Sequence, residues 1–241
     1  MNAVTELEQT ELQIPAGTVL LSANVVVPAN ATGVVLFAHG SGSSRHSPRN
    51  QFVASALNSA GIATVLADLL TIEEEVIDER TAEFRFDIPW LTTRVVQMID
   101  WVTGYEPLAK LPIGLFGAST GAAAALDAAA ARSNAVRAVV SRGGRVDLAS
   151  DIARIRAAAL FIVGEHDTLV LELNEMALQK LAGVKRLEVV PGAAHLFEEK
   201  GALERVAALA RNWFRDYLRP VTARESDSAT VRSRGERETT R

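Results

Sequence analysis

The segment Gly117-Ala118-Ser119-Thr120-Gly121 constrains this chain more than any other, because of what surrounds it. A short apolar run ending at Phe116 leads into it, and an alanine-rich helical stretch, Ala122 to Ala131, follows. A serine between two glycines on a tight strand-to-helix turn is typical of a nucleophile elbow, where side chains at the glycine positions would collide with neighbouring backbone. The pattern predicts Ser119 as a nucleophile at the carboxyl end of a strand.

A serine hydroxyl needs a histidine base within hydrogen-bond reach and a carboxylate that orients the imidazole. His195 follows a β-branched run and a Pro-Gly turn, which predicts a loop at the carboxyl edge of a strand. Asp167 follows the apolar run that ends at Gly164, and we predict it as the acid. Asp147, after the preceding strand, is the alternative acid. His166 is interpreted as structural, since a base on the same turn as its own acid would have poor geometry.

Acyl transfer also needs two backbone N–H donors at the position where the oxyanion forms. The residue after the nucleophile supplies one, which predicts the Thr120 N–H. A glycine- and serine-rich loop, His39 to Ser44, follows the apolar run 34–38, and we predict the Ser41 N–H as the second donor. His39 is interpreted as structural rather than catalytic, and it is also a candidate contact for a substrate.

These motifs resemble those of the α/β-hydrolases, and more narrowly of the dienelactone-hydrolase-like branch. The resemblance spans roughly residues 8 to 218, and the order Ser119, Asp167, His195 matches that of α/β-hydrolases. It rests also on His39-Gly40-Ser41-Gly42 and on Pro191 to Phe197. Dienelactone hydrolases use a cysteine nucleophile, whereas this chain has no cysteine and has serine in the elbow. A dienelactone substrate is therefore not expected.

The apolar runs predict an α/β fold with a mostly parallel, eight-stranded sheet and helices on both faces. Near-continuous Val, Ile, Leu and Ala runs separated by amphipathic stretches are typical of strands covered on both sides. The resemblance implies that the second strand is antiparallel. The predicted strands are 8–14, 18–27, 33–38, 62–66, 112–116, 136–140, 158–163 and 186–190.

The chain of 241 residues, 48% of them hydrophobic, fits one large domain, predicted here as residues 1–219. Residues 220–241 contain no aromatic residue and many Ser, Thr and charged residues, which predicts a disordered tail. A net charge of −4 gives no general attraction to nucleic acid or anionic membranes. No secretion signal, membrane-spanning run or metal-binding motif is visible, so we expect a cytoplasmic protein without metal or cofactor. Its oligomeric state is left open.

The acidic segment Asp68 to Asp87 lies outside the repeating strand–helix pattern. It is either a solvated acidic helix with its loop or a cap over the site. Phe86, with its neighbours Phe84 and Trp90, is a candidate for an apolar substrate pocket, although such aromatic residues more often belong to the core. Arg142 and Arg145 follow a strand and are candidates for binding a substrate carboxylate; an ion pair with an acid such as Asp147 is the favoured alternative.

Together the motifs predict a serine hydrolase that cleaves carboxylic ester or lactone bonds of small molecules. Two other functions fit the same residues: an acyltransferase that excludes water, and a non-catalytic binding module on the same fold. Acyl chain length and the identity of the alcohol depend on pocket dimensions, which motif spacing does not give.

Overall fold

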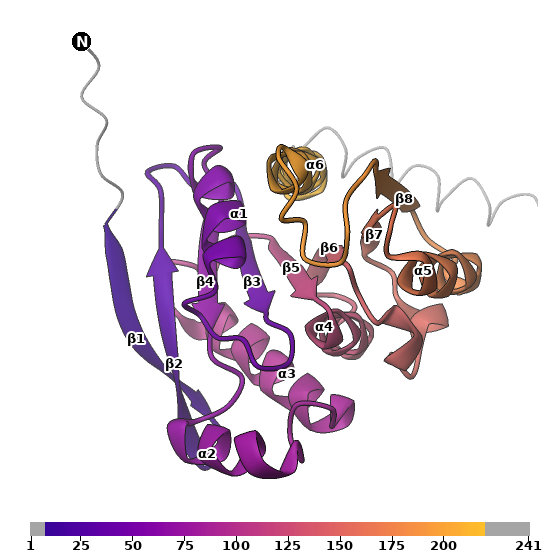
Figure 1. Ribbon diagram of the computed structural model, residues 1–241. Coiled ribbons are helices and arrows are strands. Elements are labelled where there is room, and N and C mark those ends of the chain that lie inside the picture. The colour runs from indigo at the N-terminus through magenta and orange to yellow at the C-terminus, as the bar shows by residue number, and fades with distance from the viewer. Residues whose placement is uncertain (1–7, 220–241) are drawn as a thin grey trace, which may run out of the picture.

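A computed structural model describes residues 8–219 of the protein. The predicted tail, residues 220–241, lies outside them. The described chain forms one eight-stranded sheet in the order β1-β2-β4-β3-β5-β6-β7-β8 (Figure 1). The strands are β1 (Gln9–Ala16), β2 (Val19–Val26), β3 (Val34–Ala38), β4 (Ala63–Ala67), β5 (Ile113–Ala118), β6 (Val136–Arg142), β7 (Ala158–Gly164) and β8 (Lys185–Val190).

The sheet is parallel except at β2, which pairs antiparallel with both β1 and β4. From β4 through β3 to β8, every pairing is parallel. The predicted α/β fold, the eight strands and the antiparallel second strand are therefore confirmed. Because all parallel strands end at one edge, the loops after β3, β5, β6, β7 and β8 gather there.

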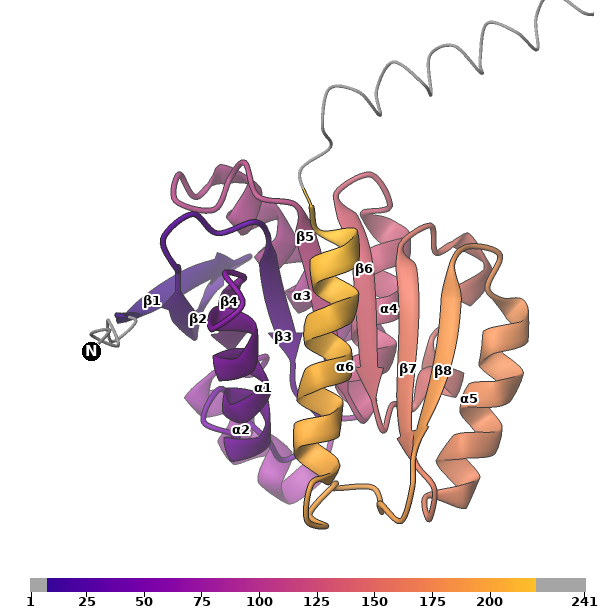
Figure 2. The same cartoon turned by 90° about the horizontal axis from the view of Figure 1, so that it is seen from above.

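Helices cover both faces of the sheet. Figure 2 shows α1 (Pro48–Asn58) and α6 (Ala202–Tyr217) side by side on one face. The opposite face carries α3 (Ile88–Gly104), α4 (Thr120–Ala131) and α5 (Thr168–Lys180). A shorter helix, α2 (Ile72–Thr81), and two 3-10 turns, η1 (Val146–Leu148) and η2 (Ile152–Arg154), complete the described elements. Between residues 8 and 219, no helix combines the length and apolarity that crossing a bilayer requires.

Burial on both faces explains the continuous apolar runs. In β3 every residue is buried: Val35 and Phe37 join the core beneath α1 and α6, while Leu36 joins the core beneath α3 and α4. Alternate side chains of a strand point to opposite faces, so a strand between two cores has no polar face.

The alanines of α4 let this helix lie close to the sheet. Ala122 to Ala125 are all fully buried, as are Ala128 and Ala129. A methyl group added at Gly121 would overlap the carbonyl oxygens of Ala38 and His39 at the end of β3. The small residues therefore set the distance between α4 and the strand ends, and with it the position of the elbow.

We predict that Ala125→Leu destabilises the fold by about 1–3 kcal/mol, because the added carbons have no space between α4 and its neighbours. Urea unfolding measures the free energy. The matched control is Ala131→Leu at the exposed end of the same helix, which should change stability by less than about 0.5 kcal/mol. Equal effects of the two substitutions would contradict close packing of α4.

Candidate active site

Ser119 lies on a strained turn between the end of β5 and the start of α4. Its φ is 51° and its ψ −122°, in a region that non-glycine residues seldom adopt. Its backbone holds this conformation through three hydrogen bonds: Ser119 N donates to Arg142 O (3.2 Å), and Ser119 O accepts from Ala122 N (3.1 Å) and Arg145 N (3.0 Å). The predicted strand-turn-helix context is present, and the strained turn fixes the serine at the carboxyl edge of the sheet.

Asp167 and His195 meet across the loops that follow β7 and β8. His195 Nδ1 lies 2.6 Å from Asp167 Oδ2. Because a carboxylate accepts, Nδ1 carries a proton and donates, and in the neutral imidazole Nε2 is then the lone-pair acceptor. The Asp167 side chain is 15% exposed and the His195 side chain 39%. Asp167 is the N-cap residue of α5 but makes no capping hydrogen bond with its side chain.

The alternative acid, Asp147, has a different partner. Its carboxylate accepts two hydrogen bonds from Arg145, at 2.9 and 2.8 Å. The sequence favoured such an ion pair for Arg142 and Arg145 over a contact with substrate, and Arg145 forms it. The structure therefore brings Asp167, and not Asp147, to His195.

Gly143 connects the elbow to the histidine. A Cβ built on Gly143 would lie 3.4 Å from both Cε1 and Nδ1 of His195, so the imidazole packs directly on this glycine. The preceding residue, Arg142, accepts the Ser119 N–H. Within residues 8–219 no hydrogen bond joins Ser119 Oγ to His195, but catalytic hydrogen bonds are often long without substrate and tighten when it binds.

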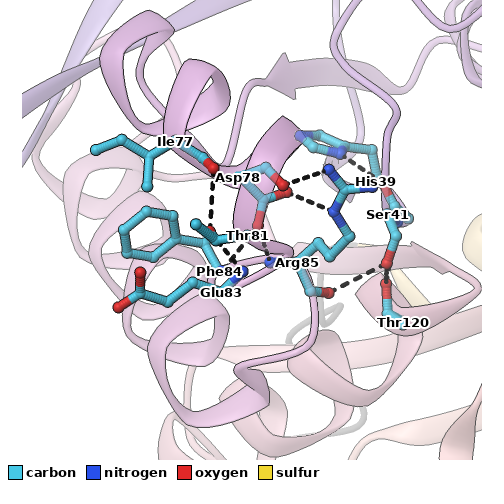
Figure 3. Close-up of polar contacts among 10 residues, drawn as sticks. His39, Ser41, Ile77, Asp78, Thr81, Glu83, Phe84, Arg85 and Thr120 are labelled. Carbon is cyan, nitrogen blue, oxygen red and sulfur yellow. Dashed lines mark hydrogen bonds and ion pairs between the residues drawn. The ribbon is translucent and has the colours of Figure 1, made fainter.

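The two predicted oxyanion donors belong to residues that contact each other. Ser41 N donates to Thr120 Oγ1 (3.1 Å), and the two hydroxyl oxygens are 3.0 Å apart. Ser41 Oγ donates to Arg85 O (3.1 Å), so the hydroxyl of Thr120 must donate to Ser41 Oγ (Figure 3). The Ser41 N–H thus points at Thr120 Oγ1 in this structure.

A buried carboxylate fixes the Arg85 carbonyl. Asp78, only 3% exposed, accepts from Phe84 N (2.8 Å), Arg85 N (2.9 Å) and Arg85 Nε (2.6 Å). Burial by itself raises the pKa of Asp78, but the hydrogen bonds and charge of Arg85 outweigh it and lower that pKa. The acidic segment 68–87 is therefore packed against the predicted oxyanion loop, residues 39–44, and is more than a solvated helix (Figure 3). Sequence reasoning missed Asp78, which has no motif of its own.

Both ring nitrogens of His39 form hydrogen bonds with nearby backbone groups. Its Nε2 accepts from Leu69 N (2.9 Å), and its Nδ1, which therefore carries the proton, donates to Gly40 O (3.0 Å). Burial lowers the pKa of His39, despite opposing effects of the Gly40 carbonyl and the Asp68 charge. A neutral imidazole with both nitrogens bonded supports the structural interpretation of His39 and leaves no ring nitrogen for a substrate hydrogen bond.

The remaining candidates differ in their surroundings. Phe86 is 60% exposed, while the Phe84 and Trp90 rings pack against each other at a tilt, with centroids 5.0 Å apart. Arg142 is buried on the α1 side of the sheet, 3.5 Å from Asn50 Oδ1. Burial, and then the charge of Arg49, lower the pKa of Arg142 to about 10. No acceptor among the described residues reaches its Nε or Nη1.

A cavity of about 260 Å³ lies beside the oxyanion loop. Its walls come from four places in the sequence: the loop 39–44, the segment 69–85, Leu91 of α3 and Thr120 of α4. Among residues 8–219, no group of three or more His, Asp or Glu side chains is arranged to hold a metal ion.

A family model described as an alpha/beta hydrolase domain matches residues 31–210, the range that contains the elbow, the Asp167–His195 pair and the oxyanion loop. This chain belongs to the α/β-hydrolase family. The match covers β3 to most of α6, so it includes the loops that follow β3, β4, β5, β6, β7 and β8 at the carboxyl edge of the sheet.

Solved structures of α/β-hydrolases place the chain in the dienelactone-hydrolase-like branch. A dienelactone hydrolase from Anabaena variabilis is 54% identical and superposes with a TM-score of 0.87, covering 88% of this chain and 99% of its own. Est1E from Butyrivibrio proteoclasticus shares the fold at 15% identity, with a TM-score of 0.71 over 86% of this chain and 98% of its own.

Curated relatives of this α/β-hydrolase come from two strains of Mycobacterium tuberculosis. Both are 52% identical over 213 residues and carry the provisional name phosphoribosyl transferase. The alignment covers 88% of this chain but 47% of theirs, so the chain spans about half the length of these relatives.

We predict that His39 makes folding stability depend on pH. Because its folded-state pKa lies below the ordinary value of 6.5, the unfolded chain binds its proton first as pH falls. The stability contributed by neutral His39 is complete above pH 6.5 and is lost as pH drops below 6.5 toward the folded-state pKa. Urea unfolding at pH 7.5 and 5.5 should show a larger loss for wild type than for His39→Gln. Equal losses would contradict a neutral, buried His39.

Proposed function

We propose that this protein is a serine hydrolase that cleaves carboxylic ester bonds of small molecules through an acyl-enzyme on Ser119. The observation that carries the proposal is the 2.6 Å contact between His195 and Asp167, in a loop that packs on Gly143 next to the elbow. An imidazole held with its proton on Nδ1 presents a free Nε2, which is the form a general base for a serine hydroxyl requires.

In the first step, Ser119 Oγ attacks the ester carbonyl carbon while His195 Nε2 takes the hydroxyl proton. The oxyanion of the tetrahedral intermediate accepts from the Thr120 and Ser41 N–H groups. For the Ser41 N–H to serve, the Thr120 hydroxyl has to rotate away from it, because Thr120 Oγ1 now accepts this N–H. His195 then gives its proton to the leaving alcohol, and the carbon–oxygen bond of the ester breaks.

In the second step, water attacks the acyl-enzyme carbonyl, with His195 taking the proton of the water and returning it to Ser119 Oγ. The acid product leaves and the enzyme is restored. Asp167 stabilises the imidazolium that forms in both steps and keeps its orientation.

An acyltransferase would use the same residues and differ only in the acceptor. Product analysis with an added alcohol or amine separates the two: transfer to the acceptor at the expense of hydrolysis would favour the transferase. The mycobacterial relatives are about twice as long as the region that matches this chain. Their provisional name describes those longer proteins as a whole, so it is not carried over to this chain.

A fluorophosphonate probe tests whether Ser119 is activated. We expect one adduct, located on Ser119 by mass spectrometry, because only a serine with a base nearby reacts readily. Ser119→Ala should abolish labelling and lower kcat for 4-nitrophenyl butyrate by at least about a thousandfold. Ser55→Ala, an exposed serine on α1, is the control and should change neither. Failure of the folded wild-type protein to label would favour the binding module.

The choice of acid is tested by two matched substitutions. We expect Asp167→Asn to lower kcat by about 10³–10⁴-fold, since the amide would favour the wrong imidazole tautomer. Asp147→Asn, which breaks only the pair with Arg145, should leave kcat within about twofold. Steady-state kinetics on a 4-nitrophenyl ester measure both. A large loss in Asp147→Asn with none in Asp167→Asn would reverse the assignment.

A further inference from the structure

The cavity beside the oxyanion loop adjoins the elbow. Gly40, Ser41 and Thr120 line it, and a Cβ built on Gly40 would lie 3.0 Å from the Cβ of Ser119. A substrate whose carbonyl reached Ser119 would therefore have one of its two substituents next to this cavity. At about 260 Å³, the space is slightly below the ~300–1,000 Å³ of typical small-molecule sites, so it admits a small group.

The inner wall of the cavity is apolar. Leu69 and Leu70, which follow β4, and Leu91 of α3 contribute to it, and all three are at most 8% exposed. A methylene chain or methyl groups of a ligand would bury apolar surface against these side chains.

The other wall carries negative charge. Glu75, Asp78 and Glu79 line the cavity, Arg85 is the sole cation among its lining residues, and His39 is neutral. Arg85 is already bound to the Asp78 carboxylate at 2.6 Å. Within residues 8–219 neither Glu75 nor Glu79 forms an ion pair, and the two stand one helical turn apart, as neighbours on the surface of α2.

The surroundings of Glu75 disfavour the charged form of its carboxylate. Burial, followed by the charges of Asp68 and Glu79, raises the pKa of Glu75. Arg45 opposes this effect, but Arg45 is paired with Asp68. A positively charged ligand group beside Glu75 and Glu79 would relieve this repulsion, whereas a carboxylate would add to it.

We propose that the cavity selects esters whose acyl part ends in a positively charged ammonium group, with Glu75 and Glu79 as the residues that recognise the charge. The leucine wall then contacts the methylene or methyl carbons around the nitrogen. This assignment of a substrate class rests on the proposed ester hydrolysis. It also gives a physical reason against substrates with a free carboxylate at this position.

Three 4-nitrophenyl esters of similar size test the charge. They are 4-(trimethylammonio)butyrate, its neutral carbon analogue 5,5-dimethylhexanoate, and the anionic 4-sulfobutyrate. We expect kcat/KM for the cationic ester to exceed that for the neutral ester by about tenfold, which is the effect of two partly screened charge contacts. The anionic ester should have the lowest kcat/KM of the three. Hydrolysis of the neutral ester tests the proposed function by itself.

Two variants link the preference to the cavity. Glu75→Gln combined with Glu79→Gln should reduce the preference, measured as the ratio of kcat/KM for the cationic ester to kcat/KM for the neutral ester, to about twofold or less. Glu83→Gln removes one charge from an exposed residue of the same segment outside the lining and should keep the preference. A wild-type enzyme that hydrolyses the neutral ester without preferring the cationic one would overturn the proposal, as would a preference that survives the double substitution.

Binding provides a readout that does not depend on catalysis. Titration calorimetry with butyltrimethylammonium should show binding to wild type and Glu83→Gln, and at least about fivefold weaker binding to the double variant. This pattern would support the cavity assignment even if no ester were hydrolysed, in which case only the proposed function would fail. Equal affinity in all three proteins, or no binding to any, would overturn the cation site.

Discussion

The close approach of α4 to the ends of β3 and β5 is the constraint on which the rest of the site depends. Without side chains at Gly117 and Gly121, the backbone can turn through the strained conformation of Ser119. Ser119 donates a backbone hydrogen bond to Arg142 and accepts one from Arg145, and these two bonds connect the elbow to the end of β6 and the loop after it. That loop supports His195 through Gly143. A single steric condition in one turn thus connects four of the strand ends that form the site, those of β3, β5, β6 and β8.

The fold could be predicted from the sequence because the central strands are buried on both faces. Val34 to Ala38 and Ala158 to Gly164 contain no charged residue, and such runs stand out from the amphipathic helices between them. The contact between Asp167 and His195 was predictable for a related reason: parallel strands put their following loops at one edge, so residues far apart in sequence meet there. The same reasoning left Asp147 open, since it also follows a strand.

Side-chain contacts between loops were not predictable in this way. Asp78 binds the backbone of a turn six and seven residues further along the chain, and its importance comes from the contact of Arg85 O with Ser41. No local sequence pattern distinguishes this carboxylate from the seven others in the segment 68–87. Likewise, Arg142 and Arg145 look alike in sequence, but their side chains diverge. Alternation along β6 sends Arg142 toward α1, while Arg145 stands beyond the strand and reaches Asp147.

The position of Asp167 at the first turn of α5 has a further consequence. A helix begins with unpaired N–H groups and a partial positive charge, and an aspartate at its N-cap ordinarily accepts one of those hydrogen bonds. Here the carboxylate turns to His195 instead, so α5 begins without a side-chain cap. The field of the helix still acts on the carboxylate, but its hydrogen-bonding capacity goes to the histidine. The first turn of α5 is therefore less stable than it would be if Asp167 capped it. The local stability of this helix end is lower because the carboxylate orients the imidazole instead.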